Sequence, residues 1–148
     1  MQNSKIDPNT ISSVYTLHRY YIWANAMRAH FDKVLNEKKP HRKGWDIESR
    51  MYMSFWYATL FVVIEGWGKS RLSDSRIDNL LSSPNVSLLR RYRNGVFHFQ
   101  AQYDDERFIE LIRDGENVVE WIRNLNQELG RFFLDRLRET KKCTQQEK

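Results

Sequence analysis

The sequence predicts an all-α protein: an up-and-down four-helix bundle with short additional helices. Apolar residues recur at three- and four-residue steps through most of the chain, which is the period of an amphipathic helix. The sequence contains no β-hairpin signal, no glycine-rich phosphate loop and no internal repeat. Its 148 residues suit one domain with a sizeable core. We expect residues 1–139 to form that domain and residues 140–148 to form a polar, disordered tail.

The first helix is expected to start at the turn in residues 7–10 and to end near Asn36, because Pro40 prevents a longer helix. One stripe of this helix is expected to face the core. It consists of Ile11, Tyr15, His18, Ile22, Ala26 and Ala29. We interpret His18 as a packed or interface histidine rather than a catalytic one.

The second helix is expected to be the most apolar, with Asp46 as its N-cap and with Gly66 and Gly68 at its end. Apolar residues cover nearly its whole circumference, which places it at the centre of the bundle or at an oligomer interface. They are Met51, Tyr52, Phe55, Trp56, Ala58, Leu60, Phe61 and Val62. The apolar run in residues 55–64 is half of the roughly 20 residues that cross a bilayer, so we expect no membrane association.

A short helix capped by Ser73 or Asp74 is expected to follow, with its end at Leu81. Ser83 and Pro84 provide a capping hydroxyl and a proline at the first helical position. The third main helix is therefore expected to start there and to include His98.

The remaining elements are a short helix and a long one. Acidic residues 104–106 are expected to begin the short helix, which reaches Arg113 before Gly115 breaks the chain. The last helix has a regular apolar stripe. This stripe consists of Val118, Ile122, Leu125, Leu129 and Phe132.

Charge and cysteine content limit the function classes. A formal charge of +5 and a sequence pI near 9.4 favour polyanionic partners, and the basic cluster in residues 38–43 is either a solvated loop or a phosphate contact. A single cysteine, Cys143, excludes an intrachain disulfide and a cysteine-rich zinc site, and indicates a cytoplasmic protein. The N-terminus does not resemble a signal peptide. Residues 104–106 lack the helix-face spacing of metal ligands, so we expect no metal and no cofactor.

The chemically richest stretch is residues 88–99, which places arginines, an amide and an imidazole among apolar and aromatic residues. Arg93 and His98 are separated by four residues, and Asn94 directly follows the arginine. In an all-α chain of this size, this pattern resembles the HEPN superfamily, whose motif is an arginine, four to six residues and a histidine, often with a polar residue after the arginine. The specific part of the resemblance is six residues long.

The resemblance implies a metal-independent endoribonuclease, of the kind found in toxin–antitoxin pairs, phage defence and RNA processing. It also implies a homodimer with the motif at the interface. Antitoxins and nucleotidyltransferases are partners of such proteins, so a protein of either class is an expected partner here besides RNA.

The residue types fit metal-free RNA cleavage by 2′-hydroxyl transesterification. His98 is suited to proton transfer, because the unperturbed pKa of histidine is about 6.5. Arg93 is suited to the phosphate, because it stays charged and presents a planar fork of donors. Asn94 lies one helical turn before His98 and is suited to orient the imidazole or to bind phosphate. Arg90 and Arg91 are expected to bind RNA.

On a regular helix, Arg93 and His98 lie roughly 140° apart. Three solutions are open: Gly95 loosens the turn, the long side chain of Arg93 reaches around, or the arginine comes from a second subunit. Two other functions also remain open. The first is a non-catalytic HEPN module that binds nucleic acid or nucleotide. The second is a helical adaptor for protein interaction.

Overall fold

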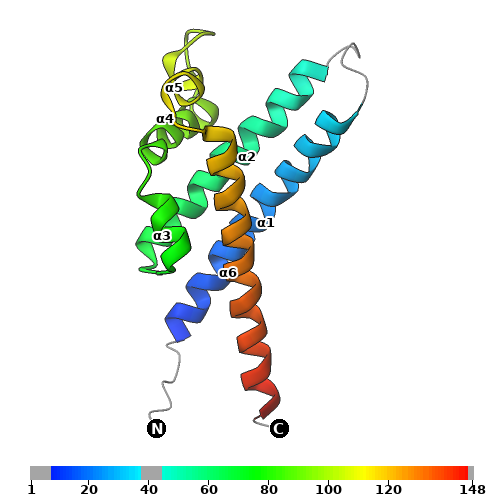
Figure 1. The fold of residues 1–148 in the computed structure, drawn as a ribbon, viewed down its shortest axis with the longest axis vertical. Coiled ribbons are helices and arrows are strands. Elements are labelled where there is room, and N and C mark those ends of the chain that lie inside the picture. The colour runs from blue at the N-terminus through cyan, green and yellow to red at the C-terminus, as the bar shows by residue number, and fades with distance from the viewer. Residues whose placement is uncertain (1–7, 38–44, 147–148) are drawn as a thin grey trace.

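The computed structural model describes residues 8–37 and 45–146, and this part of the chain contains helices and no strand. The elements in chain order are α1 (Pro8–Asn36), α2 (Trp45–Lys69), α3 (Ser75–Leu81), α4 (Asn85–Phe97), η1 (Glu106–Phe108), α5 (Glu110–Asp114) and α6 (Val118–Gln146). Figure 1 shows that α1, α2, α4 and α6 alternate in direction, while α3 and α5 lie in the connections before and after α4. The predicted all-α bundle with short additional helices is confirmed.

Helix α2 supplies the centre of the core, as its apolar circumference predicts. Trp56, Leu60 and Val63 are completely buried, and α2 packs against both α1 and α4. Nearly continuous apolar character is typical of a helix that is covered on several sides. The predicted stripe of α6 is likewise buried throughout.

A polar network joins three helices within this apolar core. The indole Nε1 of Trp56 donates to Oδ1 of Asn126 at 3.0 Å, and Nδ2 of Asn126 donates to Oδ1 of Asn25 at 3.0 Å. On the same side, Arg28 and Arg123 both bind the carboxylate of Asp32. Because buried polar groups need partners, this network fixes the positions of α1, α2 and α6 relative to one another.

The predicted core stripe of α1 is wrong. Ile22 and Tyr15 are about half exposed, whereas Val14, Leu17 and Ala24 are buried. The buried residues form one stripe on a different side of the helix, because apolar residues occur on both sides of α1 and its neighbours α2 and α6 cover the side that carries Val14, Leu17 and Ala24. Gly66 permits the observed packing on the α2 side, because a Cβ there would lie 2.6 Å from Cδ2 of Leu17 and would force that side chain to shift.

Helix starts follow the predicted capping residues in one case and differ in two. The side chain of Asp74 accepts hydrogen bonds from the backbone N–H groups of Arg76 and Ile77, and so caps α3. The hydroxyl of Ser83 accepts from the N–H of Asn85 at 3.2 Å, but α4 begins at Asn85 with Pro84 as its N-cap, so Pro84 lies one position before the first helical position that was predicted for it. Asp46, in contrast, lies inside the first turn of α2, where its charge complements the helix dipole.

Two helices, α2 and α6, also extend further than predicted. Helix α2 continues through Gly66 and Gly68 to Lys69. Helix α6 continues to Gln146, so residues 140–146 are helical where a disordered tail was expected. The hydroxyl of Thr140 bonds to the carbonyl of Arg136 at 3.0 Å, and the lysine and glutamine residues beyond it are good helix formers.

None of the described helices combines the length and the apolar character that crossing a membrane requires. Residues 8–10 of the predicted turn already belong to α1, while Asp7 and the basic cluster in residues 38–43 lie outside the described residues.

Candidate functional site

The site is built on the end of α4. Leu89, Tyr92 and Gly95 are buried and hold the helix in the bundle. Gly95 permits a close approach, because a Cβ there would make tight contacts, 3.1 Å from Cβ of Arg107 and 3.3 Å from the ring of Phe108. Helix α4 is thereby pressed against η1, and its last turn is brought to the surface beside the segment that follows.

His98 is the first residue after α4 and not its last helical residue, which corrects the expected boundary by one position. Its backbone is extended, with φ −121° and ψ 133°. The side chain of Gln100 accounts for this end, because its Nε2 donates to the carbonyl of His98 at 2.8 Å and to that of Asn94 at 3.4 Å. In a longer helix, backbone N–H groups of the next turn would donate to these carbonyls. Here the side-chain amide of Gln100 donates to them instead.

The imidazole of His98 faces an open groove of about 730 Å³, formed by α2, the end of α4 and the segment up to α5. The side chain is exposed, and within the described residues the imidazole forms no hydrogen bond or ion pair. Both ring nitrogens are therefore available to a ligand. This state suits a group that exchanges protons with a substrate.

Arg93 lies on a different surface. Its guanidinium carbon is 5.1 Å from the centroid of the Phe61 ring, and its Nη2 is 3.9 Å from Oε1 of Glu65. Its buried Nε has no hydrogen-bond partner in the described chain. Because Arg93 contacts α2 and is not among the residues that line the groove, one chain does not bring Arg93 and His98 together.

Asn94 is linked to His98 only through the backbone. Its carbonyl accepts the N–H of His98 at 3.1 Å, while its half-buried side chain forms no hydrogen bond with a described residue. The expected orientation of the imidazole by the Asn94 amide is therefore not observed. The extended backbone at His98 explains this, because the face shared by residues four apart exists only within a regular helix.

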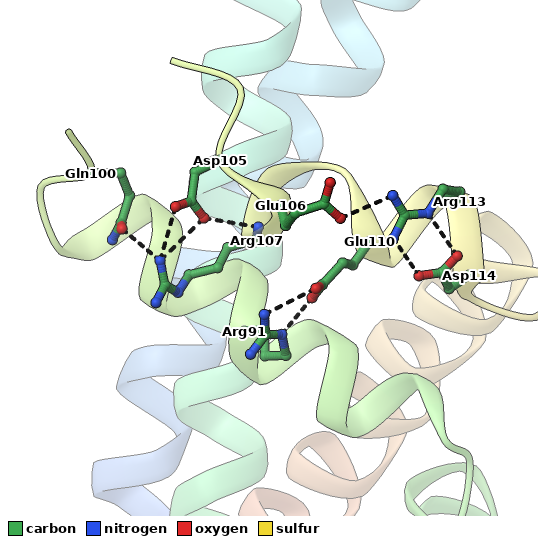
Figure 2. Close-up of polar contacts among 8 residues, drawn as sticks. All are labelled: Arg91, Gln100, Asp105, Glu106, Arg107, Glu110, Arg113 and Asp114. Atoms are coloured by element: carbon green, nitrogen blue, oxygen red, sulfur yellow. Dashed lines mark hydrogen bonds and ion pairs between the residues drawn. The ribbon is translucent and has the colours of Figure 1, made fainter. Parts of the chain in front are cut away.

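Arg90 and Arg91 differ in their surroundings. Figure 2 shows that Arg91 binds the carboxylate of Glu110 with two nitrogens, Nε and Nη2, the latter at 2.9 Å from Oε1. The hydrogen bond from Arg91 lowers the pKa of Glu110. Arg90 is exposed, and no described carboxylate pairs with it. It lies three residues before Arg93, so the two cations share one face of α4.

The other histidines are not part of this site. The ring of His18 lies 5.3 Å from that of Phe133, and burial lowers its pKa. His30 stacks on Tyr52 at 5.1 Å, and His41 lies outside the described residues. In the part of the chain that the structure describes, no group of three or more His, Cys, Asp or Glu residues has the arrangement of a metal site.

Sequence reasoning missed several groups that share the groove with His98: the cation Arg50, the hydroxyls of Ser54 and Tyr92, and the rings of Phe99 and Tyr103. The two rings follow the motif directly, and aromatic residues in a polar loop were a usable signal. The remaining groups come from α2 and the buried side of α4, so only the fold reveals them.

Comparison with protein-family models, with curated proteins and with solved structures found no match to this chain. The function must therefore be argued from the geometry of the site.

Proposed function

We propose that this protein is a metal-independent endoribonuclease of the HEPN type. The observation that carries the proposal is the free, exposed imidazole of His98 at an open groove, close in sequence to the cationic α4 face of Arg90 and Arg93. An unpaired imidazole and an arginine fork are the groups that metal-free RNA cleavage needs.

The chemistry is an internal transesterification. A base removes the proton of a ribose 2′-hydroxyl, and the oxygen attacks the adjacent phosphorus. An acid then protonates the departing 5′-oxygen. The products are a 2′,3′-cyclic phosphate and a 5′-hydroxyl. In this scheme His98 moves the proton, Arg93 stabilises the charge on the phosphorane, and Asn94 binds phosphate.

A homodimer would bring Arg93 and His98 together in one site. Arg93 and His98 lie on different surfaces of one chain, so a two-fold axis near α4 would place Arg93 of one copy beside His98 of the other. It would also supply a second imidazole, and with it both a base and an acid. Phe55 and Phe97 support this interface, because their rings lie 6.4 Å apart and both are about 40–45% exposed.

The biological setting belongs to the same proposal. Metal-free RNases of this type act as toxins or phage-defence effectors in the cytoplasm. A partner that restrains this chain, either an antitoxin or a nucleotidyltransferase, would complete such a system. The catalytic scheme uses no metal and no cofactor, since protein side chains supply both proton transfer and charge stabilisation.

Analysis of product ends tests the chemistry. Purified protein is incubated with a labelled single-stranded RNA in excess chelator, and the 3′-ends are identified by mass. The proposal expects 2′,3′-cyclic phosphate ends. Products with 3′-hydroxyl ends, or a strict requirement for magnesium, would show a different reaction.

A second candidate is a module that binds RNA without cleaving it. It is favoured by one observation, the engagement of Arg93 with Phe61 and Glu65 away from the groove. Salt-dependent RNA binding without any cleavage, in a preparation shown to be dimeric, would favour this candidate.

A further inference from the structure

The groove at His98 carries two aromatic side chains that are almost entirely in water. Phe99 is 96% exposed and Tyr103 is 94% exposed. Folding normally buries large rings, and an exposed apolar group is informative where it borders a hollow in the surface. Both rings belong to the groove that also holds the imidazole.

Side-chain hydrogen bonds and an ion pair hold the segment that carries these rings in place. The Nη1 of Arg107 donates to Oε1 of Gln100 at 2.7 Å and binds the carboxylate of Asp105 at 3.0 Å, as Figure 2 shows. Gln100 in turn holds the carbonyl of His98. Because the segment is already held, a ligand that packs on its rings loses less free energy to ordering.

The groove has the size and the composition of a ligand site. Its volume of about 730 Å³ lies within the range of roughly 300–1,000 Å³ that is common for such sites. Apolar side chains dominate the walls, and the hydroxyls of Ser54 and Tyr92 form a hydrogen bond of 2.9 Å within it. Arg50 also lines the groove, is exposed, and pairs with no described carboxylate.

We propose that this groove binds unpaired bases of single-stranded RNA, which stack on Phe99 and Tyr103. The inference rests on the proposed ribonuclease function and names its substrate class. Stacking on aromatic rings accepts every base, since each base has a π-face. A duplex hides those faces, so the groove selects single strands. A base on Phe99 would lie in the groove that His98 also lines.

Charge favours RNA over a protein as the occupant. Asp104 is the one carboxylate among the described groove residues, and the cation Arg50 offsets it. The whole chain carries a formal charge of +5. Arg50 is free to meet a backbone phosphate, as in other grooves that follow a single strand.

A double-mutant cycle tests the stacking. The probe is a labelled 2′-O-methyl RNA, which cannot be cleaved because its 2′-oxygen is blocked, and binding is followed by fluorescence anisotropy. Phe99→Leu removes the ring and keeps apolar volume, Phe99→Tyr keeps a ring, and Tyr15→Leu changes an exposed ring on α1 outside the groove. A second probe set carries one abasic nucleotide at each position in turn.

We expect Phe99→Leu to weaken binding about 5- to 100-fold, with Phe99→Tyr and Tyr15→Leu close to wild type. At the stacked position, an abasic nucleotide should cause a similar loss in the wild type and little further loss in Phe99→Leu. Equal affinities of wild type and Phe99→Leu would overturn the proposal. So would a Phe99→Leu variant that keeps its affinity but dissociates from dimer to monomer in sedimentation, because the ring would then be a protein contact.

The outcome is separable from that of the ribonuclease proposal, because the probe is never cut. Ring-dependent binding supports stacking even if the wild type cleaves no RNA. Cleavage by the wild type together with ring-independent binding would overturn stacking alone.

Discussion

The guanidinium of Arg93 lies over the ring of Phe61, with 5.1 Å between the guanidinium carbon and the ring centroid. This contact holds the arginine on the α2 side of α4, while His98 lines the groove beyond the end of the helix. The two parts of the motif therefore serve one reaction only if a second chain brings them together.

Replacing Arg93 should stop cleavage without unfolding the protein. We expect Arg93→Ala to cleave RNA about 100-fold or more slowly, because it removes the charge that stabilises the phosphorane. Loss of the contact with Phe61 should cost about 0.5–1 kcal/mol in the free energy of unfolding. Arg138→Ala is the control, since it removes the same charge from an exposed position on α6. Equal cleavage rates for Arg93→Ala and this control would remove Arg93 from the mechanism.

Arg90 and Arg91 should differ in their contribution to RNA affinity. Arg90→Gln removes a free cation, so the slope of log affinity against log salt should fall by about 1. The double variant Arg91→Gln/Glu110→Gln removes a bound pair with no change in net charge, and its slope should match that of the wild type. If the double variant lowers the slope as much as Arg90→Gln does, Arg91 contacts RNA in spite of Glu110.

The free energy of unfolding should fall at alkaline pH because the hydroxyl of Tyr57 is buried. Burial raises the pKa of its hydroxyl to about 12, with a further contribution from Tyr92. A tyrosine in an unfolded chain titrates near pH 10, so the unfolded state loses this proton first and stability falls as pH rises from about 10 to about 12. Below pH 10 the contribution is complete. Tyr57→Phe should avoid about 2–3 kcal/mol of that loss in denaturant titrations.

Tyr103→Phe is the matched control, because this hydroxyl belongs to a side chain that is almost fully exposed. Its stability should follow the wild type at every pH. A Tyr57→Phe variant that loses as much stability as the wild type between these pH values would contradict the burial of the Tyr57 hydroxyl.

Mixed subunits should recover activity. Arg93→Ala and His98→Ala chains, mixed under conditions that allow exchange, form heterodimers as half of all dimers, and one of the two Arg93–His98 pairs in each is intact. Activity should therefore return in part, to less than about a quarter of the wild-type value, because each heterodimer has one intact pair but lacks the second imidazole. Activity no higher than the sum of the unmixed variants would contradict the transfer of Arg93 across the interface.

The sequence was sufficient for features that depend on neighbours along the chain. Helical period gave the bundle, and the side chain of Asp74 caps α3 as its position before that helix predicts. The buried face of α1 was not predictable in this way. It depends on α1 having two neighbouring helices, whose positions its own sequence does not encode.

The candidate site likewise combines features that the local sequence predicts with features that depend on contacts between distant residues. The motif identified His98, but the end of α4 before it depends on Gln100 and Arg107, whose side chains bind each other across seven residues. The pairing of Arg91 with Glu110 spans 19 residues. The position of Arg93 is set by Phe61 on another helix. Contacts of this kind are made by folding, and residue spacing alone cannot supply them.

The most direct test of the account is cleavage of a single-stranded RNA in excess EDTA by wild-type protein and by His98→Ala. Because His98 is exposed and unpaired among the described residues, its replacement should leave the thermal midpoint unchanged. His30→Ala, which changes a histidine stacked on Tyr52 outside the groove, is the control. The account predicts cleavage by the wild type and by His30→Ala, and a loss of about 100-fold or more in His98→Ala. Cleavage by His98→Ala at the wild-type rate, or no metal-free cleavage by the dimeric wild type, would contradict it.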